Sequence, residues 1–180
     1  MGTRLFELTH DAPKRLEMMH GDPHPGNFML MPDNKMGVID FGAVAPLPGG
    51  LPIELGLALR YGVEKDYDNL LTTMERVGFI QKGEQVSTRE LDDMLRQYVE
   101  PISVESFHYT RKWLQKVTLV NWDRSVAQLK TARQMDIPPK LAIPMRVIAS
   151  VVAMSCQLSA TVPVRSIAID LIPGFADEAA

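Results

Sequence analysis

The chain has 180 residues, of which 46% are hydrophobic and 23% charged, and its formal net charge is −3. These values predict one packed domain and exclude a largely disordered chain, and the slightly acidic balance argues against a nucleic-acid-binding protein. The single cysteine, Cys156, excludes an internal disulfide and lies in an apolar run, so we expect it to be buried and the protein to be cytoplasmic. We find no export signal at the N-terminus.

The first predicted element is an amphipathic helix over residues 4–18. Leu5, Leu8 and Leu16 recur near one face of this helix, with charged residues on the other. Pro13 lies inside the pattern, and proline lacks the N–H that a helix interior needs. We therefore predict a break near residues 11–13.

Residues 20–42 contain the most informative pattern, HGDPHPGNFMLMPDNKMGVIDFG. Asp22 is followed five positions later by Asn27, and an Asp-Phe-Gly turn begins at Asp40. This order resembles the catalytic loop and metal-binding turn of protein kinases. Taken singly, the same residues are common in turns, but their combination at this spacing favours a kinase-like site.

A β-hairpin is predicted between the two loops. Residues 28–31 form a short apolar strand, residues 32–35 form the turn, and residues 37–39 form the return strand. Since a hairpin brings its ends together, Asn27 and Asp40 should lie close to each other.

The resemblance implies a role for each site residue. Asp22 would be the catalytic base, and Asn27 and Asp40 would ligate Mg²⁺. The cofactor-binding residues would be His24, Asn27, Asp40 and Gly42. Gly42 would act as the hinge that lets the metal-binding turn approach. For His24 two interpretations stay open: it shapes the loop, or it reaches a substrate or phosphate.

Two residues beside the catalytic Asp have structural interpretations. His20 is expected to brace the loop. Gly21 replaces the Arg that holds a phosphorylated activation loop in many kinases, so we do not expect that switch here.

The chain beyond Gly42 is expected to be a short activation segment, residues 43–50, followed by helices. The helical patterns have breaks at Gly78, Gly83, Pro101, Pro138–Pro139 and Pro163. They cover residues 51–64, 66–77, 88–100, 105–120, 123–134, 139–159 and 163–172. The apolar stretch 141–164 contains Arg146 and several hydroxyl residues, which favours a buried core helix over a membrane span.

The run H-x-D-P-H-P-G-N followed by D-F-G resembles the UbiB/ADCK/AarF family of atypical kinases, in its actinobacterial-type branch. Members of this family are associated with isoprenoid-quinone or lipid metabolism, so the resemblance implies an ATP- and Mg²⁺-dependent kinase or ATPase. Aminoglycoside and choline phosphotransferases carry a similar loop, usually with Leu where this chain has Pro23. A phosphotransferase of that type is therefore an alternative function.

The fold class expected from this resemblance is α+β, mostly α: a protein-kinase-like C-terminal lobe without its N-terminal lobe. We expect one domain over residues 1–180, with an entering helix at 1–19, the catalytic region at 20–50 and a helical subdomain at 51–180. The chain contains no G-x-G-x-x-G and no K-x-G-Q motif. We therefore expect weak Mg²⁺-ATP binding and no activity of the chain alone. A non-catalytic binding or regulatory module is a further alternative.

Apolar residues of the hairpin side would be left uncovered in such a lobe. We expect self-association or a protein partner there, with a lipid partner and membrane association as the alternatives that the family suggests. The residues concerned are Phe28, Met29, Leu30, Met31, Val38, Ile39 and Phe41.

Overall fold

The computed structural model describes residues 1–84, 86–122 and 137–176. The described part is mostly helical, with short strands. Its helices are α1 (Gly2–Leu16), α2 (Ile53–Glu64), α3 (Tyr67–Val77), α4 (Thr88–Ile102), α5 (Arg111–Trp122), α7 (Pro139–Gln157) and α8 (Val164–Leu171). Its strands are β1 (Met18–His20), β2 (Phe28–Leu30), β3 (Met36–Val38), β4 (Val44–Pro46), β5 (Phe107–His108) and β6 (Thr161–Val162).

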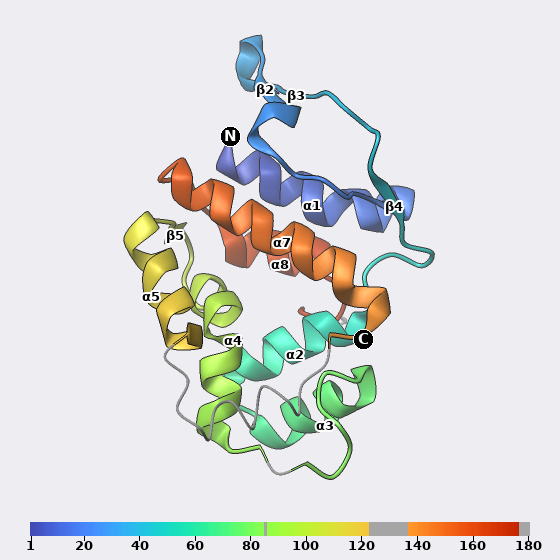
Figure 1. Ribbon diagram of the computed structural model, residues 1–180, viewed down its shortest axis with the longest axis vertical. Coiled ribbons are helices and arrows are strands. Elements are labelled where there is room, and N and C mark those ends of the chain that lie inside the picture. Colours follow the sequence, from blue (N-terminus) through green and yellow to red (C-terminus); the bar gives the residue numbers. More distant parts are fainter. Residues whose placement is uncertain (85, 123–136, 177–180) are drawn as a thin grey trace.

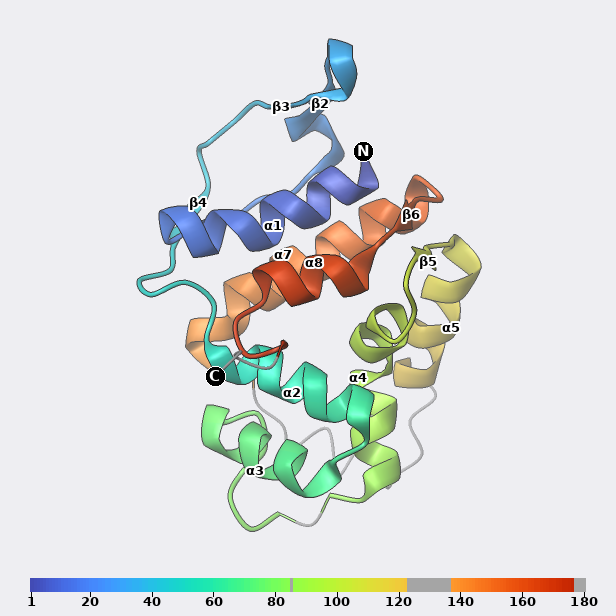
Figure 2. The same cartoon turned by 180° about the vertical axis from the view of Figure 1, so that it is seen from behind.

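The main core forms where α1 packs beside α7 and α8 (Figures 1 and 2). Phe6 of α1 stacks on Tyr109, and Tyr109 meets Trp113 of α5 edge to face. Cys156 is fully buried in this cluster, and burial raises the pKa of its thiol to about 11. The prediction that Cys156 is a buried apolar residue is therefore confirmed.

A smaller core joins α2, α3 and α4. Leu70, Met74 and Leu91 are almost completely buried in it. The ends of these helices follow from the sequence: Gly78 closes α3 in the left-handed conformation, and Ser87 caps α4 in a capping box with Glu90. The residues that start and end these helices therefore agree with the way α2, α3 and α4 pack together.

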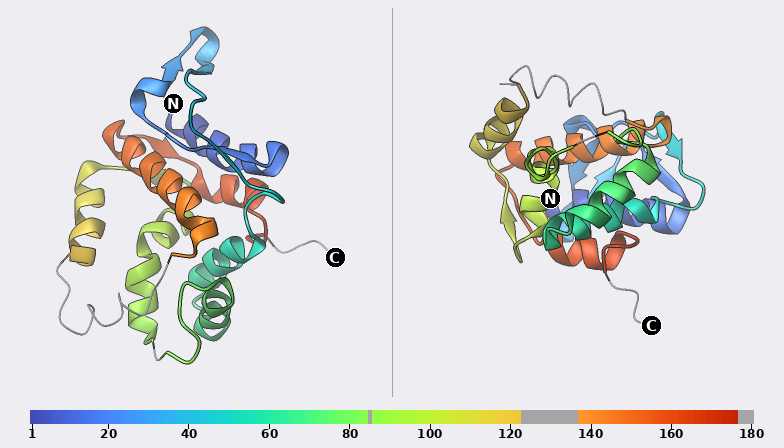
Figure 3. Two further views of the ribbon diagram at one scale, coloured as in Figure 1. Left: turned by 45° about the vertical axis from the view of Figure 1, so that its right-hand side comes forward. Right: turned by 90° about the horizontal axis from the view of Figure 1, so that it is seen from below.

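The strands of the described chain form three two-stranded antiparallel ladders, β1–β4, β2–β3 and β5–β6. The β2–β3 hairpin has the predicted position, with Phe28 opposite Val38, and projects away from the helices (Figure 3). The β1–β4 ladder pairs the chain just before Gly21 with the start of the predicted activation segment. The two segments that flank the hairpin are thus joined at their base.

Two predicted elements need correction, and the break predicted at Pro101 falls later, because α4 includes the buried Pro101 and ends at Ile102. Helix α1 runs unbroken through Pro13, which lies in its last turns and is fully buried, so packing stabilises the helix where propensity does not. The helix predicted from residue 105 begins only at Arg111, because Phe107 and His108 pair with β6 instead. The helix predicted over residues 123–134 lies outside the described residues.

Within the described residues, α7 is the one helix long and apolar enough to cross a membrane by length and composition. Its buried side includes Val147, Val151 and Met154, which pack into the protein interior. This packing agrees with the expected core helix.

The segment after α8 packs closely against α2. A Cβ atom built on Gly56 would lie 2.0 Å from the carbonyl oxygen of Pro173. Glycine at position 56 therefore permits a backbone approach that any side chain would prevent.

Candidate nucleotide and metal site

His20 links the predicted catalytic loop to the predicted metal-binding turn. Its Nε2 lies 2.8 Å from the carbonyl oxygen of Asp40, and its Nδ1 lies 3.3 Å from the backbone nitrogen of Asp22. A carbonyl can only accept, so Nε2 carries the proton and donates, while Nδ1 accepts from the Asp22 N–H. One neutral imidazole therefore fixes both backbones, as the bracing role expected of His20 requires.

Asn27 is held by three hydrogen bonds. Its side-chain Nδ2 donates to the carbonyl of Asp22 at 3.0 Å, its backbone N–H donates to His24, and its own carbonyl accepts from Ile39. Because the amide nitrogen is used in this way, the oxygen Oδ1 is left to bind a cation. The contact with Ile39 also connects Asn27 to the strand that leads to Asp40.

Asp40 adopts a positive φ of 73°, which is uncommon for a residue with a side chain. Its Oδ1 accepts a hydrogen bond from the Gly42 N–H at 2.8 Å, and a Cβ on residue 42 would lie 3.0 Å from the same oxygen. Gly42 therefore lets the turn fold tightly over the carboxylate. Such conformations persist where the surrounding structure imposes them, often at functional sites.

His24 contributes to the shape of the loop. Its Nδ1 accepts from the Gly26 N–H at 3.1 Å and caps the short 3₁₀ turn over Pro25–Asn27. Of the two interpretations of His24, this contact supports the loop-shaping one.

Arg146 is a site residue that sequence reasoning missed. Its Nη2 donates to the carbonyl oxygen of Gly21, across 125 positions of the chain. Gly21 is buried and donates its own N–H to the carbonyl of Ala43 at 2.6 Å. Helix α7 is thereby attached to the residue that directly precedes Asp22. An arginine inside an apolar helix was the signal that could have pointed to such a contact.

The donor set suits magnesium better than zinc. The described residues contain no group of three or more His, Cys, Asp or Glu side chains placed to hold a metal. Mg²⁺ needs fewer protein ligands, because it keeps several waters and takes oxygens from substrate phosphates. The Asn27 amide oxygen and the Asp40 carboxylate fit that requirement, and Asp22 and Asp40 are both exposed to solvent.

The apolar hairpin side is largely exposed, as expected. The exposed fractions are 63% for Leu30 and 65% for Phe41, and Met29, Met31 and Ile39 are also exposed. Phe28 and Val38 are the exceptions: Phe28 is 9% exposed and packs into the main core beside His20, and Val38 is half-buried against the same core. The prediction for Phe28 was wrong because its side chain points inward from the ladder.

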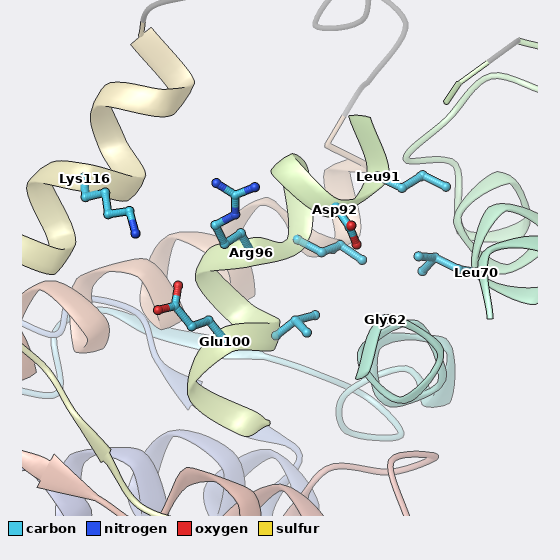
Figure 4. Close-up of a pocket in the computed structure, with 9 residues that line it drawn as sticks. Gly62, Leu70, Leu91, Asp92, Arg96, Glu100 and Lys116 are labelled. Atoms are coloured by element: carbon cyan, nitrogen blue, oxygen red, sulfur yellow. The ribbon is translucent and has the colours of Figure 1, made fainter. Parts of the chain in front are cut away.

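A hollow of about 370 Å³ lies between α2, α4 and α5, away from residues 20–42. Figure 4 shows Arg96, Glu100 and Lys116 on its α5 side and Asp92 facing α3. Asp92 accepts a hydrogen bond from Tyr67, and Arg96 pairs with Asp93. The lining charges are of both signs, so this hollow favours no strongly charged ligand.

Comparisons with known proteins found similarity to a kinase-like domain family. The model of the ABC1 atypical kinase-like domain family matches residues 1–74. Protein ACTIVITY OF BC1 COMPLEX KINASE 1, chloroplastic, from Arabidopsis thaliana is 39% identical over 70 residues, which are 39% of this chain and 10% of that protein. Protein ACTIVITY OF BC1 COMPLEX KINASE 3, chloroplastic, from the same plant is 24% identical over 127 residues, 71% of this chain and 17% of that protein.

One solved structure is similar along almost the whole chain. It is the complex of Rv3197 with erythromycin from Mycobacterium tuberculosis, with 66% identity and a TM-score of 0.89. The similarity covers 98% of this chain and 44% of that one, so this chain spans less than half of the solved protein and about a tenth of the first curated relative. The match of residues 1–74 to the ABC1 atypical kinase-like domain, together with these relatives, supports the UbiB/ADCK family of atypical kinase-like proteins for this chain.

Proposed function

We propose that this chain provides the catalytic loop and metal-binding turn of an ATP- and Mg²⁺-dependent atypical kinase or ATPase. The observation that carries the proposal is the double contact of His20, which ties the backbone of Asp22 to that of Asp40. A phosphoryl-transfer site needs a base beside the nucleophile and oxygen ligands beside the phosphates, held in fixed geometry. The two hydrogen bonds of His20 fix the backbone of Asp22, which carries the base, and the backbone of Asp40, which carries an oxygen ligand.

The site residues have separate roles in this proposal. Asp22 accepts the proton of the attacking hydroxyl or water, and its exposure leaves the carboxylate accessible to a substrate. Asn27 Oδ1 and the Asp40 carboxylate hold Mg²⁺, and Asp40 thereby also contributes to nucleotide binding. When bound, the metal offsets charge on the phosphates. Gly42 orients the Asp40 carboxylate through its N–H, and His24 shapes the loop beside the cofactor.

The same proposal assigns the chain to a kinase-like C-terminal lobe, one domain over residues 1–180. A small-molecule phosphotransferase of the aminoglycoside or choline type and a non-catalytic regulatory module are the alternatives. A link to isoprenoid-quinone or lipid metabolism, and a cytoplasmic location with membrane association, follow from family resemblance. Two of the relatives carry the word chloroplastic in their names, which supports an association with organelles in that part of the family.

A matched set of amide substitutions tests the catalytic proposal. In a longer protein that joins this chain to a phosphate-binding lobe and is active as the wild type, Asp40→Asn should abolish ATP hydrolysis or phosphoryl transfer, because an amide cannot neutralise the metal. Asp22→Asn should lower the rate by about 10²–10⁴-fold, the usual contribution of a positioned base. Asp33→Asn is the control, because Asp33 lies in the hairpin turn, outside the site. Equal activity of all three variants would contradict the proposal and favour the non-catalytic alternative.

A second candidate function is the binding of a macrolide. It is favoured by the 66% identity with the solved Rv3197–erythromycin complex over 98% of this chain. Calorimetric titration with erythromycin tests it. Saturable binding by the wild type and by Asp40→Asn would support a macrolide site that is independent of the metal site, and no heat of binding would contradict it.

A further inference from the structure

A second cavity lies inside the helical part of the molecule. Its volume is about 420 Å³, and α1, α2, α4, α7 and α8 all contribute to its lining. Protein interiors contain few voids larger than a water molecule, whereas small-molecule sites occupy roughly 300–1,000 Å³. The size of this cavity is therefore typical of a ligand site and unusual for a packing defect.

The described lining of the cavity is mainly apolar and contains no Asp, Glu, Lys or Arg. Representative apolar residues are Leu55, Met94, Met145, Ile148 and Ile167. Transfer of a charged ligand into such surroundings would cost far more free energy than transfer of an apolar one. The lining therefore favours an uncharged and mostly apolar molecule.

His10 is a polar side chain in the lining of the cavity that can orient a ligand through a hydrogen bond. It is 6% exposed, and its Nδ1 lies 2.8 Å from the carbonyl oxygen of Phe6, one turn earlier on α1. That carbonyl can only accept, so Nδ1 donates and Nε2 carries a lone pair. Burial lowers the pKa of His10, which keeps the ring neutral.

The Nε2 atom of His10 has no hydrogen-bond partner among the described residues. Since Nδ1 faces its own helix and the residue lines the cavity, the opposite edge of the ring faces the cavity. An apolar ligand that covered Nε2 without a donor would leave this acceptor unpaired, which is costly, whereas a ligand that supplies an O–H avoids that cost. Tyr98 also lines the cavity, and burial raises the pKa of its hydroxyl, so it stays protonated.

We propose that this cavity binds an uncharged, mainly apolar small molecule that carries a hydroxyl group, and that His10 Nε2 accepts a hydrogen bond from that hydroxyl. The site is separate from the catalytic loop, because no residue of segment 20–42 lines it. The proposal therefore holds or fails independently of the phosphoryl-transfer function.

A matched pair of probes tests the hydroxyl requirement. 4-Octylphenol has the hydroxyl, and 4-octylanisole has the same chain with the oxygen methylated, so that it cannot donate. Calorimetry on the wild-type chain should show the phenol binding roughly tenfold more tightly, because the ether leaves the acceptor unpaired. No binding of either probe, or equal affinity for both, would overturn the proposal.

Three variants locate the site. His10→Leu removes the acceptor but keeps an apolar side chain, so it should bind both probes equally; retained preference for the phenol would overturn the role of His10. Met145→Trp should fill the cavity and abolish binding of both probes. Ile143→Trp is its control on the same helix, because Ile143 is exposed and does not line the cavity. Unchanged binding by Met145→Trp would overturn the location.

A measurement on the unmodified protein covers the case in which His10→Leu does not fold. In ¹⁵N NMR of the wild type, the signal of His10 Nε2 should move upfield when the phenol is added, because its lone pair becomes hydrogen-bonded. The anisole should leave it in place. An unmoved signal at saturating phenol would overturn the proposal.

Discussion

Replacement of Arg146 by Met tests whether helix α7 holds the catalytic loop. The substitution keeps an unbranched side chain of similar length and removes the donor to the Gly21 carbonyl. Because Gly21 is buried, its carbonyl would lose a partner without gaining full access to water. A hydrogen bond from a charged donor contributes about 1.5–3 kcal/mol, and a buried group left unpaired costs about 1–3 kcal/mol.

The expected loss is smaller than the upper end of these ranges, because Arg146 itself is exposed and water screens its charge. We expect about 1–2 kcal/mol, which is roughly a 5- to 30-fold change in the folding equilibrium. Urea denaturation gives the global value. Amide hydrogen exchange should show the largest local loss of protection at Gly21, whose N–H is bound to Ala43.

Arg4→Met is the control for this measurement. Arg4 pairs with Glu7 on the exposed surface of α1, so its replacement should change the free energy of unfolding by less than about 0.5 kcal/mol. If Arg146→Met has the stability of Arg4→Met and leaves exchange at Gly21 unchanged, the link from α7 to the catalytic loop contributes nothing. The argument for Arg146 as a positioning residue would then be refuted.

Three further predictions concern the close contact of α2 with the segment after α8, the buried His10 and the exposed hairpin residues. Gly56→Ala should destabilise the fold by about 1–3 kcal/mol or more, because its Cβ would overlap a backbone carbonyl; a melting curve like that of the wild type would contradict this. The pKa of His10 is lowered from 6.5 in the fold, so the unfolded chain takes up the proton first and the free energy of unfolding should fall as pH drops below about 6.5. Urea denaturation at pH 7.5 and 5.5 should show that the free energy of unfolding depends less on pH in His10→Leu than in the wild type, whereas His108→Gln should keep the wild-type dependence. An equal pH dependence in both variants would contradict the role of His10. Sedimentation should show self-association through the exposed hairpin side, and Leu30→Ser or Phe41→Ser should reduce it. A monomer at high concentration would show that this side of the molecule does not mediate self-association.

Sequence reasoning succeeded where the signal was local. The hairpin between Asn27 and Asp40 was predicted from turn residues and strand length, and its position agrees with the structure. The end of α3 followed from the glycine at position 78. In each case a few neighbouring residues determine the backbone conformation, so no tertiary information was needed.

The missed features depend on residues far apart in the sequence. The β1–β4 and β5–β6 ladders contain only two or three residues a strand, too few to produce an alternating pattern. The contact of Arg146 with Gly21 spans most of the chain. The inward position of Phe28 and the tolerance of α1 for Pro13 are likewise set by packing, which overrides local preference.

The central claim is that Asn27 and Asp40 form a metal-nucleotide site beside Asp22. Paramagnetic broadening of backbone amide signals by Mn²⁺-ATP tests it on the chain itself, because Mn²⁺ accepts the same oxygen ligands as Mg²⁺ and weak binding suffices. We predict that broadening is strongest for residues 21–28 and 40–43, and that Asp40→Asn removes most of it while Asp33→Asn does not. Broadening centred on other acidic residues, or unchanged by Asp40→Asn, would contradict the assignment.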